Sequence, residues 1–386
     1  MFLYQNNLKN RLFKCAKSPN FNDSSGCFGI RFLILTLVSF SLFSCNGNLH
    51  SNRMAKESSI LPCVDPKISE KVLICGVCRN IEQAVPNTRK SIEKVGSQFA
   101  DYRVVIYENN STDKTKELLS SWEKEDPRLI FISEQLSANE LRRRSVMKIT
   151  HRIEKIAMAR NIVLDQIMDP YFDDYKYVIW ADLDFVKPWD VDGIVETVLH
   201  PEQEWDAVFA YGAYDLFALR SPECPIGFEL LGPTYWGRLD EIRKVFVLHE
   251  DAPWKKVYSA FGGLGIYKRE AMRGCVYSPV VTKDLEKAVS QWISQAKRGA
   301  PPLFLQDYEK KVQTAQIVDL LGKSLSHRKS YPDDLGVRMP RGKVVWFSCT
   351  KDTSLPWTCE HLPFHATMML HGFDRLFVNP RLHCDP

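Results

Sequence analysis

Four apolar runs, each ending in polar residues, constrain the fold of this chain more than any other feature of its sequence. Continuous runs of this kind are typical of strands in a parallel sheet that helices cover on both faces. Helix-like periodicity fills the intervals, over about 86–99, from 114 onward and over about 149–168. The alternation of strands and helices therefore predicts an α/β fold with a mostly parallel sheet. The four runs are Lys71–Cys78, Tyr102–Tyr107, Arg128–Ser133 and Tyr177–Trp180.

Composition limits the architecture more than the function. The 386 residues carry 51 basic and 47 acidic side chains, and the net charge of +4 is too balanced to indicate a nucleic-acid partner. Residues 71–386 are enough for a single large domain with insertions. Within it we expect a first half over 71–210, a second half over 211–386, and an insertion at about 280–345.

The cysteines do not indicate a disulfide framework. There are eleven of them, an odd number that cannot pair completely. Cys75 and Cys78 have the spacing of a redox or zinc motif, but they lie within an apolar run. We therefore expect them to be small buried side chains.

The first 45 residues have the features of a targeting segment. Five basic side chains and one acid precede an apolar stretch, residues 32–43, which is closed by Ser44 and Cys45. The stretch is shorter than the roughly 17–25 residues of a spanning helix. Three alternatives stay open: a signal sequence with Cys45 as a lipidated residue, a short signal anchor, or an extension ahead of a cytoplasmic domain. We favour membrane association, on an unspecified side, with residues 46–70 as a linker.

Two acids follow the fourth apolar run, where its strand is expected to end. Asp182 and Asp184 are separated by one residue, and residues i and i+2 of an extended backbone point the same way. Two carboxylates can thus converge on one hard cation at the carboxyl edge of the sheet, where open α/β folds hold their ligands. Mn²⁺ or Mg²⁺ prefers such oxygen ligands. The alternative is a strand that ends in a solvated acidic turn.

The second apolar run ends in the segment Glu108-Asn-Asn-Ser-Thr-Asp113, directly before a helix is expected to begin. Ser, Thr and Asp cap helix N-termini, so a well-capped helix is one interpretation. The other is that Glu108 accepts hydrogen bonds from the base or ribose of a nucleotide, as acids do at the end of a dinucleotide-fold strand.

In this order the motifs resemble those of nucleotide-sugar glycosyltransferases of the GT-A fold, both the family-2-like enzymes and the capsule-associated mannosyltransferase-like proteins. The resemblance rests on segment 108–113, on Ala159-Arg160-Asn161 and on Asp182-Leu183-Asp184. It implies a Rossmann-like, mostly parallel sheet with helices on both faces. It also implies that the Asp-x-Asp motif holds a divalent metal on the donor diphosphate.

The resemblance further implies which residues meet the nucleotide. Glu108, where the family usually has Asp, would contact the base, and Arg160 and Asn161 would lie near the nucleotide. We assign Asn80, at the end of the first strand, and Asp113 to the same nucleotide site.

The second half contains three further motifs. Gly262 and Gly263 lie between apolar residues, where glycine permits a close backbone approach, either at a β-bulge or, as the resemblance implies, beside the donor sugar. The resemblance makes Glu360, at the start of the last helix, the acceptor-side catalytic residue, and His383, after the last strand, a third metal ligand. We expect His361 and His365 to be packed or solvated.

These features predict an enzyme that moves a sugar, in a hexosyl- or mannosyltransferase-like reaction, from a nucleotide-diphosphate sugar to a hydroxyl acceptor on a glycan, lipid or protein. The cofactor would be Mn²⁺ or Mg²⁺. One alternative is a nucleotidyltransferase, which the lack of a glycine-rich loop at Cys78-Arg79-Asn80 disfavours. Another is a membrane-anchored protein that binds a sugar or nucleotide without catalysis.

Overall fold

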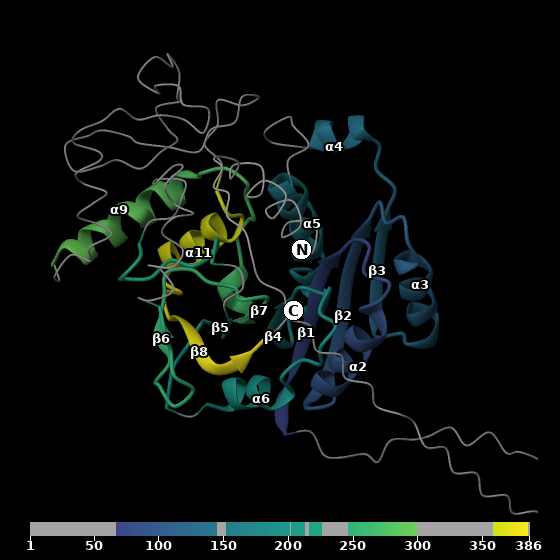
Figure 1. Cartoon of the computed structure of the whole chain (residues 1–386), viewed down its shortest axis with the longest axis horizontal. Coiled ribbons are helices and arrows are strands. Elements are labelled where there is room, and N and C mark those ends of the chain that lie inside the picture. The colour runs from purple at the N-terminus through teal and green to yellow at the C-terminus, as the bar shows by residue number, and fades with distance from the viewer. Residues whose placement is uncertain are drawn as a thin grey trace, which may run out of the picture. The chain divides into compact units, whose positions relative to one another are not determined.

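One mixed sheet of eight strands lies at the centre of the described part of the chain (Figure 1). The computed structural model describes residues 67–144, 152–200, 202–212, 216–225, 246–298 and 358–384. All of them belong to the unit Asp65–Pro386, and the targeting segment and most of the expected linker and insertion lie outside them. The strands are β1 (Ile68–Cys78), β2 (Phe99–Asn109), β3 (Leu129–Glu134), β4 (Tyr175–Ala181), β5 (Ala207–Tyr211), β6 (Lys255–Lys256), β7 (Leu264–Lys268) and β8 (Leu376–His383).

Six of these strands run in one direction. The order across the sheet is β3-β2-β1-β4-β7-β5-β8-β6, in which β3, β2, β1 and β4 are parallel neighbours. β7 is antiparallel to both β4 and β5, so β5 and its parallel neighbour β8 run in the same direction as β4. β6 is antiparallel to β8 at the edge. The expected mostly parallel α/β sheet is confirmed, and its parallel strands end along one edge.

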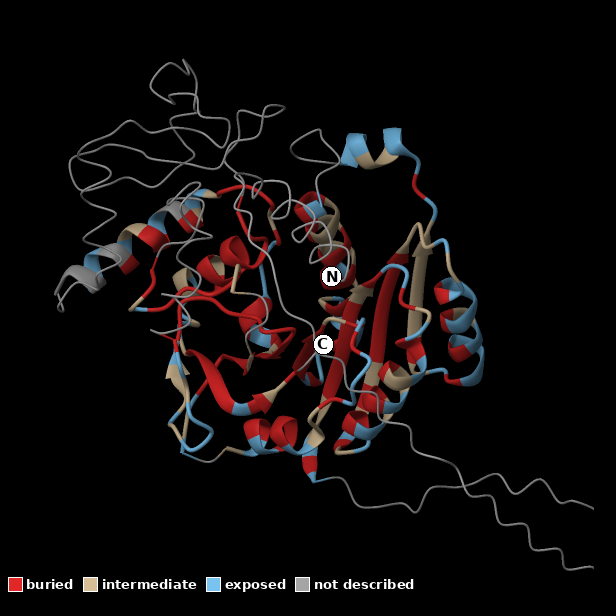
Figure 2. Ribbon diagram, viewed as in Figure 1, coloured by how far each residue is buried: buried red, intermediate tan, exposed pale blue. Residues whose placement is uncertain are grey.

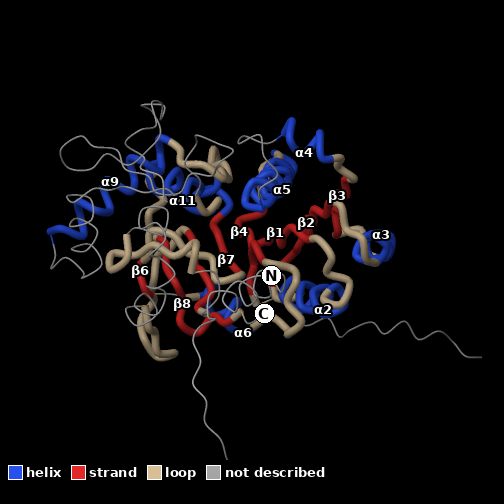
Figure 3. Tube along the Cα trace, turned by 45° about the horizontal axis from the view of Figure 1, so that its top comes forward, coloured by secondary structure: helices blue, strands red, loops and turns tan. Residues whose placement is uncertain are grey.

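Helices cover both faces of the sheet, because alternate residues of each strand point to opposite sides. Leu73 and Cys75 of β1 belong to a core cluster with α5, α9 and α11, whereas Val72 and Ile74 belong to a second cluster with α2, α3 and α6. Figure 2 shows the buried strands between these helices, and Figure 3 shows the two helical layers with the strands between them. The helices are α2 (Val85–Gly96), α3 (Thr115–Glu125), α4 (Ala138–Arg144), α5 (Arg152–Ile167), α6 (Val191–Leu199), α9 (Lys283–Arg298) and α11 (His361–Leu370).

The cysteines of β1 serve this packing. All six cysteines of the described residues are free and buried, which confirms the expectation for Cys75 and Cys78. Burial raises the pKa of the Cys78 thiol, so this side chain behaves as an apolar one.

Helix α4 was not predicted, although its sequence holds a recognisable start signal. The Ser137 hydroxyl accepts a hydrogen bond from the Glu140 backbone N–H at 3.2 Å, and the Glu140 carboxylate accepts one from the Ser137 N–H at 2.8 Å. This reciprocal arrangement is a capping box, which the spacing Ser-x-x-Glu announces. None of its seven residues is buried, so hydrophobic periodicity gave no indication of the helix.

Three elements lie differently from the segments that we expected. β1 begins at Ile68, a fully buried residue within the segment expected to be linker. α9 lies inside the expected insertion, yet Leu285 and Trp292 are buried in the main core, with Trp292 stacked on Tyr258 at 4.9 Å. β8 continues through Pro380 to His383, because the pairing register with β5 shifts between Ala210 and Tyr211 and accommodates the proline there.

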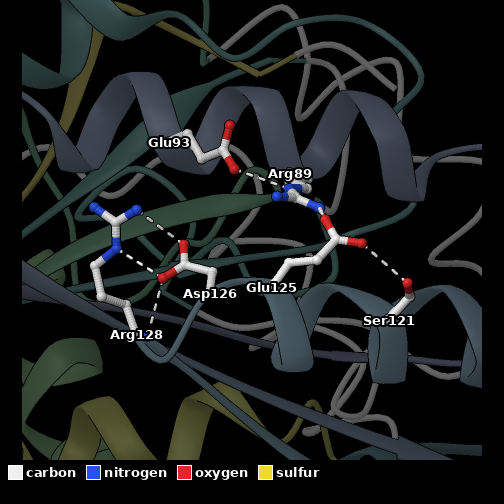
Figure 4. Close-up of polar contacts among 6 residues, drawn as sticks. All are labelled: Arg89, Glu93, Ser121, Glu125, Asp126 and Arg128. Carbon is white, nitrogen blue, oxygen red and sulfur yellow. Dashed lines mark hydrogen bonds and ion pairs between the residues drawn. The ribbon is translucent and has the colours of Figure 1, made fainter. Parts of the chain in front are cut away.

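Two polar networks join the outer ends of α2, α3 and β3 (Figure 4). In the first, Arg89 Nε contacts Glu93 Oε1 at 2.8 Å and Arg89 Nη1 contacts Glu125 Oε2 at 2.6 Å. The Arg89 guanidinium also lies over the Trp122 ring at 5.6 Å. These side chains are one-third or more exposed, so we assign this network a contribution of only about 0.2–1 kcal/mol per pair.

The second network contains a buried carboxylate, that of Asp126. The Arg128 side chain donates two parallel hydrogen bonds to the Asp126 carboxylate, from Nε to Oδ1 at 2.8 Å and from Nη2 to Oδ2 at 3.0 Å. The Arg128 backbone N–H also donates to Oδ1. Burial by itself would raise the pKa of Asp126, but the hydrogen bonds from Arg128 lower it below its ordinary value. A carboxyl group with a lowered pKa stabilises the fold at pH values above its unfolded-state pKa of about 3.9.

We predict that Asp126→Asn lowers the free energy of unfolding by about 1–3 kcal/mol at pH 7, since charged hydrogen bonds are lost. The loss should shrink as the pH falls below about 4, because the unfolded-state carboxylate then takes up a proton first and the native one follows only at its lower pKa. Urea unfolding at pH 7 and pH 3 measures both values. The exposed Asp165→Asn is the control, and an equal loss for Asp126→Asn at both pH values would contradict the assignment.

Candidate active site

The Asp-x-Asp motif lies where it was expected, directly after β4. The Asp182 backbone N–H donates to the Gly263 carbonyl at 2.8 Å, which ties the strand end to the turn before β7. Leu183 is buried, whereas Asp182 is partly buried and Asp184 is exposed. A Cβ at Gly76 would lie 2.7 Å from the Leu183 side chain, so this glycine of β1 leaves the space in which Leu183 anchors the motif.

Arg160 of α5 lies beside the motif and joins it to the last helix. Its Nη2 is 3.3 Å from Asp182 Oδ1, and its Nε is 3.3 Å from Glu360 Oε1. The arginine and Glu360 side chains are 4% and 8% exposed, so this is a buried ion pair. Burial alone would lower the pKa of Arg160, but Asp182 and Glu360 raise it above its ordinary value. The guanidinium is therefore a fixed positive charge between two carboxylates.

Three aromatic rings enclose the same guanidinium. Its central carbon lies 4.7 Å from the Phe261 ring centre, 5.5 Å from Trp180 and 5.7 Å from Tyr277. We call Phe261, Trp180 and Tyr277 the aromatic cage. Cation–π attraction is strongest when the cation is desolvated, as it is here.

Asn161 supports the cage. Its side-chain amide donates to the Tyr277 carbonyl at 2.8 Å and its amide oxygen accepts from the Tyr277 N–H at 2.9 Å. Both functions of the amide are thus used to hold the backbone at Tyr277. The expected contact between Asn161 and a nucleotide stays a prediction.

The side chains predicted to bind the nucleotide join two neighbouring strand-end loops. Glu108 is buried, and its carboxylate accepts from the Ser111 N–H at 2.6 Å and from the Ser133 hydroxyl at 2.8 Å. Asn80, in the left-handed region at φ 55°, accepts from the Thr112 N–H at 2.8 Å. Glu108 therefore holds the loop after β2 to the end of β3, and a role at the base stays a prediction.

Asp113 also connects the loop after β1 with the loop after β2. Its carboxylate accepts from the Glu82 N–H at 3.1 Å and from the Thr115 N–H at 3.0 Å. Burial would raise the pKa of Asp113, but the hydrogen bonds from Thr115 and Glu82 lower it. Asp113 thus accepts a hydrogen bond from the first residue of α3 and joins it to the loop after β1, and contact with a nucleotide stays a prediction.

The backbone conformation at residues 262 and 263 favours glycine at both positions. Gly262 and Gly263 have φ values of 62° and 88°, a region that favours glycine. A Cβ at Gly262 would lie 2.3 Å from the Ala210 carbonyl oxygen of β5. The close approach is therefore to the neighbouring strand, and the Gly263 carbonyl that results receives the Asp182 N–H.

Glu360 and two histidines stand at the start of α11. The His361 ring stacks on Phe261 at 4.3 Å, and its Nε2 is 3.8 Å from Glu360 Oε1. His365 contacts the Ser259 hydroxyl through Nδ1 at 2.8 Å and the Tyr267 hydroxyl through Nε2 at 3.1 Å. Burial, together with the charge of Arg160, lowers the pKa of His361 well below its usual range and that of His365 to about 3. Both rings are packed, as expected.

His383 lies at the end of β8, with other partners. Its backbone N–H donates to Asp190 Oδ2 at 3.3 Å, and its Nε2 lies 3.6 Å from Glu250 Oε1. Across the described ranges, no group of three or more His, Cys, Asp or Glu side chains is placed to hold a metal ion. The metal-ligand roles of Asp182, Asp184 and His383 stay predictions.

The chemistry of the Asp182–Asp184 pair fits a divalent metal that is shared with a substrate. Mg²⁺ in nucleotide enzymes usually takes one or two carboxylates, and its other ligands are water and substrate phosphates. Two carboxylates at an exposed strand end meet this need, since Asp184 faces solvent. A cation there does not require a third protein ligand.

Searches of protein-family models and of curated proteins find no match. Among solved structures, the chain is similar to the mannosyltransferase PcManGT from Pyrobaculum calidifontis, solved with GDP-Man and Mn²⁺, at 16% identity and a TM-score of 0.34 over 65% of this chain and 72% of that one. It is also similar to glucosyl-3-phosphoglycerate synthase from Mycobacterium tuberculosis, solved with Mn²⁺, UDP and phosphoglyceric acid, at 13% identity and a TM-score of 0.31 over 61% of this chain and 66% of that one.

A third similar structure is S. aureus TarS 1-349, at 13% identity and a TM-score of 0.28, over 54% of this chain and 50% of that one.

We predict that Gly262→Ala destabilises the fold more than Gly274→Ala. Both glycines have positive φ, 62° and 75°, so both variants bear a backbone strain of about 1–3 kcal/mol. Only at Gly262 does the new Cβ also meet backbone, since at Gly274 the nearest atom is a His371 carbon at 3.4 Å. The excess loss for Gly262→Ala should be at least about 1 kcal/mol in chemical unfolding. Equal losses would show that the Ala210 carbonyl is not a tight neighbour.

Proposed function

We propose that this chain is a glycosyltransferase that moves a sugar from a nucleoside diphosphate sugar to a hydroxyl acceptor with the help of a divalent cation. The observation that carries the proposal is the arrangement at the end of β4. A pair of carboxylates, the partly buried Asp182 and the exposed Asp184, is backed by a buried arginine that also contacts Glu360. Strand ends of an α/β sheet are where such folds hold nucleotides.

Asp184 and Asp182 would hold the cation in different ways. Asp184 is exposed after the strand end, which suits a direct metal ligand. Asp182 Oδ1 already contacts Arg160, which suits a contact to the donor sugar or to a metal-bound water. A divalent cation, when bound, neutralises the charge that develops on the departing diphosphate.

The loops after β1 and β2 would receive the nucleotide. Asn80 and Asp113 fix these loops to each other, and Glu108 holds the loop after β2. These residues therefore contribute to binding through the shape of the loops as well as through any direct contact. The sequence resemblance favours a hexosyl donor, with a mannosyl donor as the first to test.

Glu360 would serve the acceptor. It lies at the start of α11, and Arg160 holds its carboxylate in place at 3.3 Å. If the reaction inverts configuration, Glu360 accepts the proton of the attacking hydroxyl. If configuration is retained, Glu360 orients that hydroxyl.

We predict that the protein binds GDP or UDP more tightly with MnCl₂ than with EDTA, by at least about tenfold, since the cation bridges carboxylates and phosphates. Asp184→Asn should remove most of this metal dependence, whereas Asp182→Asn should leave a clear part of it, because an indirect ligand contributes less than a direct one. Titration calorimetry with each nucleotide measures these affinities.

Asp192→Asn, an exposed acid in the first turn of α6, is the matched control and should bind like the wild type. If no nucleoside diphosphate binds in a manganese-dependent way, the proposed function is wrong. If Asp182→Asn loses more than Asp184→Asn, the division between the two carboxylates is wrong.

We further propose that residues 32–43 attach the enzyme to a membrane; this rests on sequence alone. No helix within the described residues has the length and apolar character to cross a bilayer, and residues 32–43 lie outside them. Removal of residues 1–45 should move the protein from the membrane pellet to the supernatant in cell fractionation. The full chain recovered in the supernatant would contradict this proposal.

A further inference from the structure

Three charged side chains from distant parts of the chain meet next to the Asp-x-Asp motif. Arg160 comes from α5, Asp182 follows β4, and Glu360 precedes α11. The proposed function places Asp182 with the donor and Glu360 with the acceptor. Arg160 is 3.3 Å from each carboxylate, so one side chain touches both sides of the reaction.

The surroundings of Arg160 favour a role inside the protein over a direct contact with the nucleotide. The guanidinium is 4% exposed and lies within the aromatic cage, with Phe261 at 4.7 Å. Two of its nitrogens face the carboxylates. The sequence resemblance puts this arginine near the nucleotide, and in the structure the aromatic cage and the two carboxylates lie around its guanidinium.

The planar guanidinium of Arg160 can fix the positions of two carboxylates at once. Its nitrogens diverge in a rigid fork, so it can hold two carboxylates at a fixed separation, whereas an ammonium group on a flexible stem cannot fix both. Without a cation between them, Asp182 and Glu360 would repel each other in a site of low dielectric constant. Asn161 completes the support, since it holds Tyr277 of the cage through two hydrogen bonds.

We propose that Arg160 is a positioning residue that sets the distance between the donor-side Asp182 and the acceptor-side Glu360. This inference rests on the proposed function for the meaning of the two sides. The reacting groups of a transferase must be aligned closely, and a misplacement of about 1 Å can cost 100-fold in rate.

The first test compares Arg160→Lys with Arg269→Lys. Arg269 is also a buried arginine, but it donates to the Ile167 and Asp169 carbonyls and to Asp173, away from both carboxylates. Arg160→Lys should lower kcat by about 100-fold, with the donor KM and the calorimetric affinity for GDP or UDP in MnCl₂ changed by less than about threefold. Arg269→Lys should lower the melting temperature and leave kcat unchanged.

A rise in donor KM or a loss of nucleotide affinity in Arg160→Lys would overturn the inference, because Arg160 would then be a nucleotide contact. The two variants are also compared at an equal loss of melting temperature. If Arg160→Lys then lowers kcat no more than Arg269→Lys does, the inference is overturned too, because the role of Arg160 would be structural.

The second test needs no substrate. Arg160→Gln and Glu360→Gln should each lower the melting temperature, and the double variant should melt no lower than Arg160→Gln alone, because the unpaired buried carboxylate is removed as well. Additive losses would overturn the coupling. This thermal cycle still reports on Arg160 if no nucleoside diphosphate binds, so failure of the proposed function is distinguishable from failure of this inference.

Discussion

A parallel sheet covered on both faces has no polar surface of its own, and the structure follows from that constraint. β1 from Val72 onward and β4 from Tyr177 onward are largely buried on both faces, and their side chains there are apolar. Polar chemistry is then confined to the edge where the parallel strands end. The ends of β1, β2 and β4 lie along this edge, with Asn80 after β1, Glu108 near the end of β2 and Asp182 after β4.

Much of this could be predicted from sequence, because the signals are local. Apolar runs marked β1 to β4, and the Asp-x-Asp motif fell at the end of β4 as its spacing required. The contacts of Arg160 were not predictable, since its partner Glu360 lies in a distant segment and is brought near only by the packing of α11. The available signal in the sequence was that Arg160 is a charged residue among the apolar residues of α5.

Some side chains turned out to hold backbone where the family resemblance suggested ligand contacts. Glu108 and Asn161 each satisfy two backbone or side-chain partners, and Gly262 is fixed by the Ala210 carbonyl. A motif specifies a residue type and a place in the chain. It does not distinguish a residue that touches a ligand from one that shapes the loop around it, because both need the same hydrogen-bonding groups.

The place of β8 in the sheet has a consequence for how the chain folds. β8 lies between β5 and β6. Until residues 376–383 are available, β5 therefore lacks one of its two partner strands and β6 lacks its partner strand. During synthesis, β5 presents an open apolar edge across the whole interval from residue 211 to residue 376. Open strand edges recruit other chains. The protein is therefore most exposed to misassembly late in its synthesis, and chaperone dependence should centre on that interval.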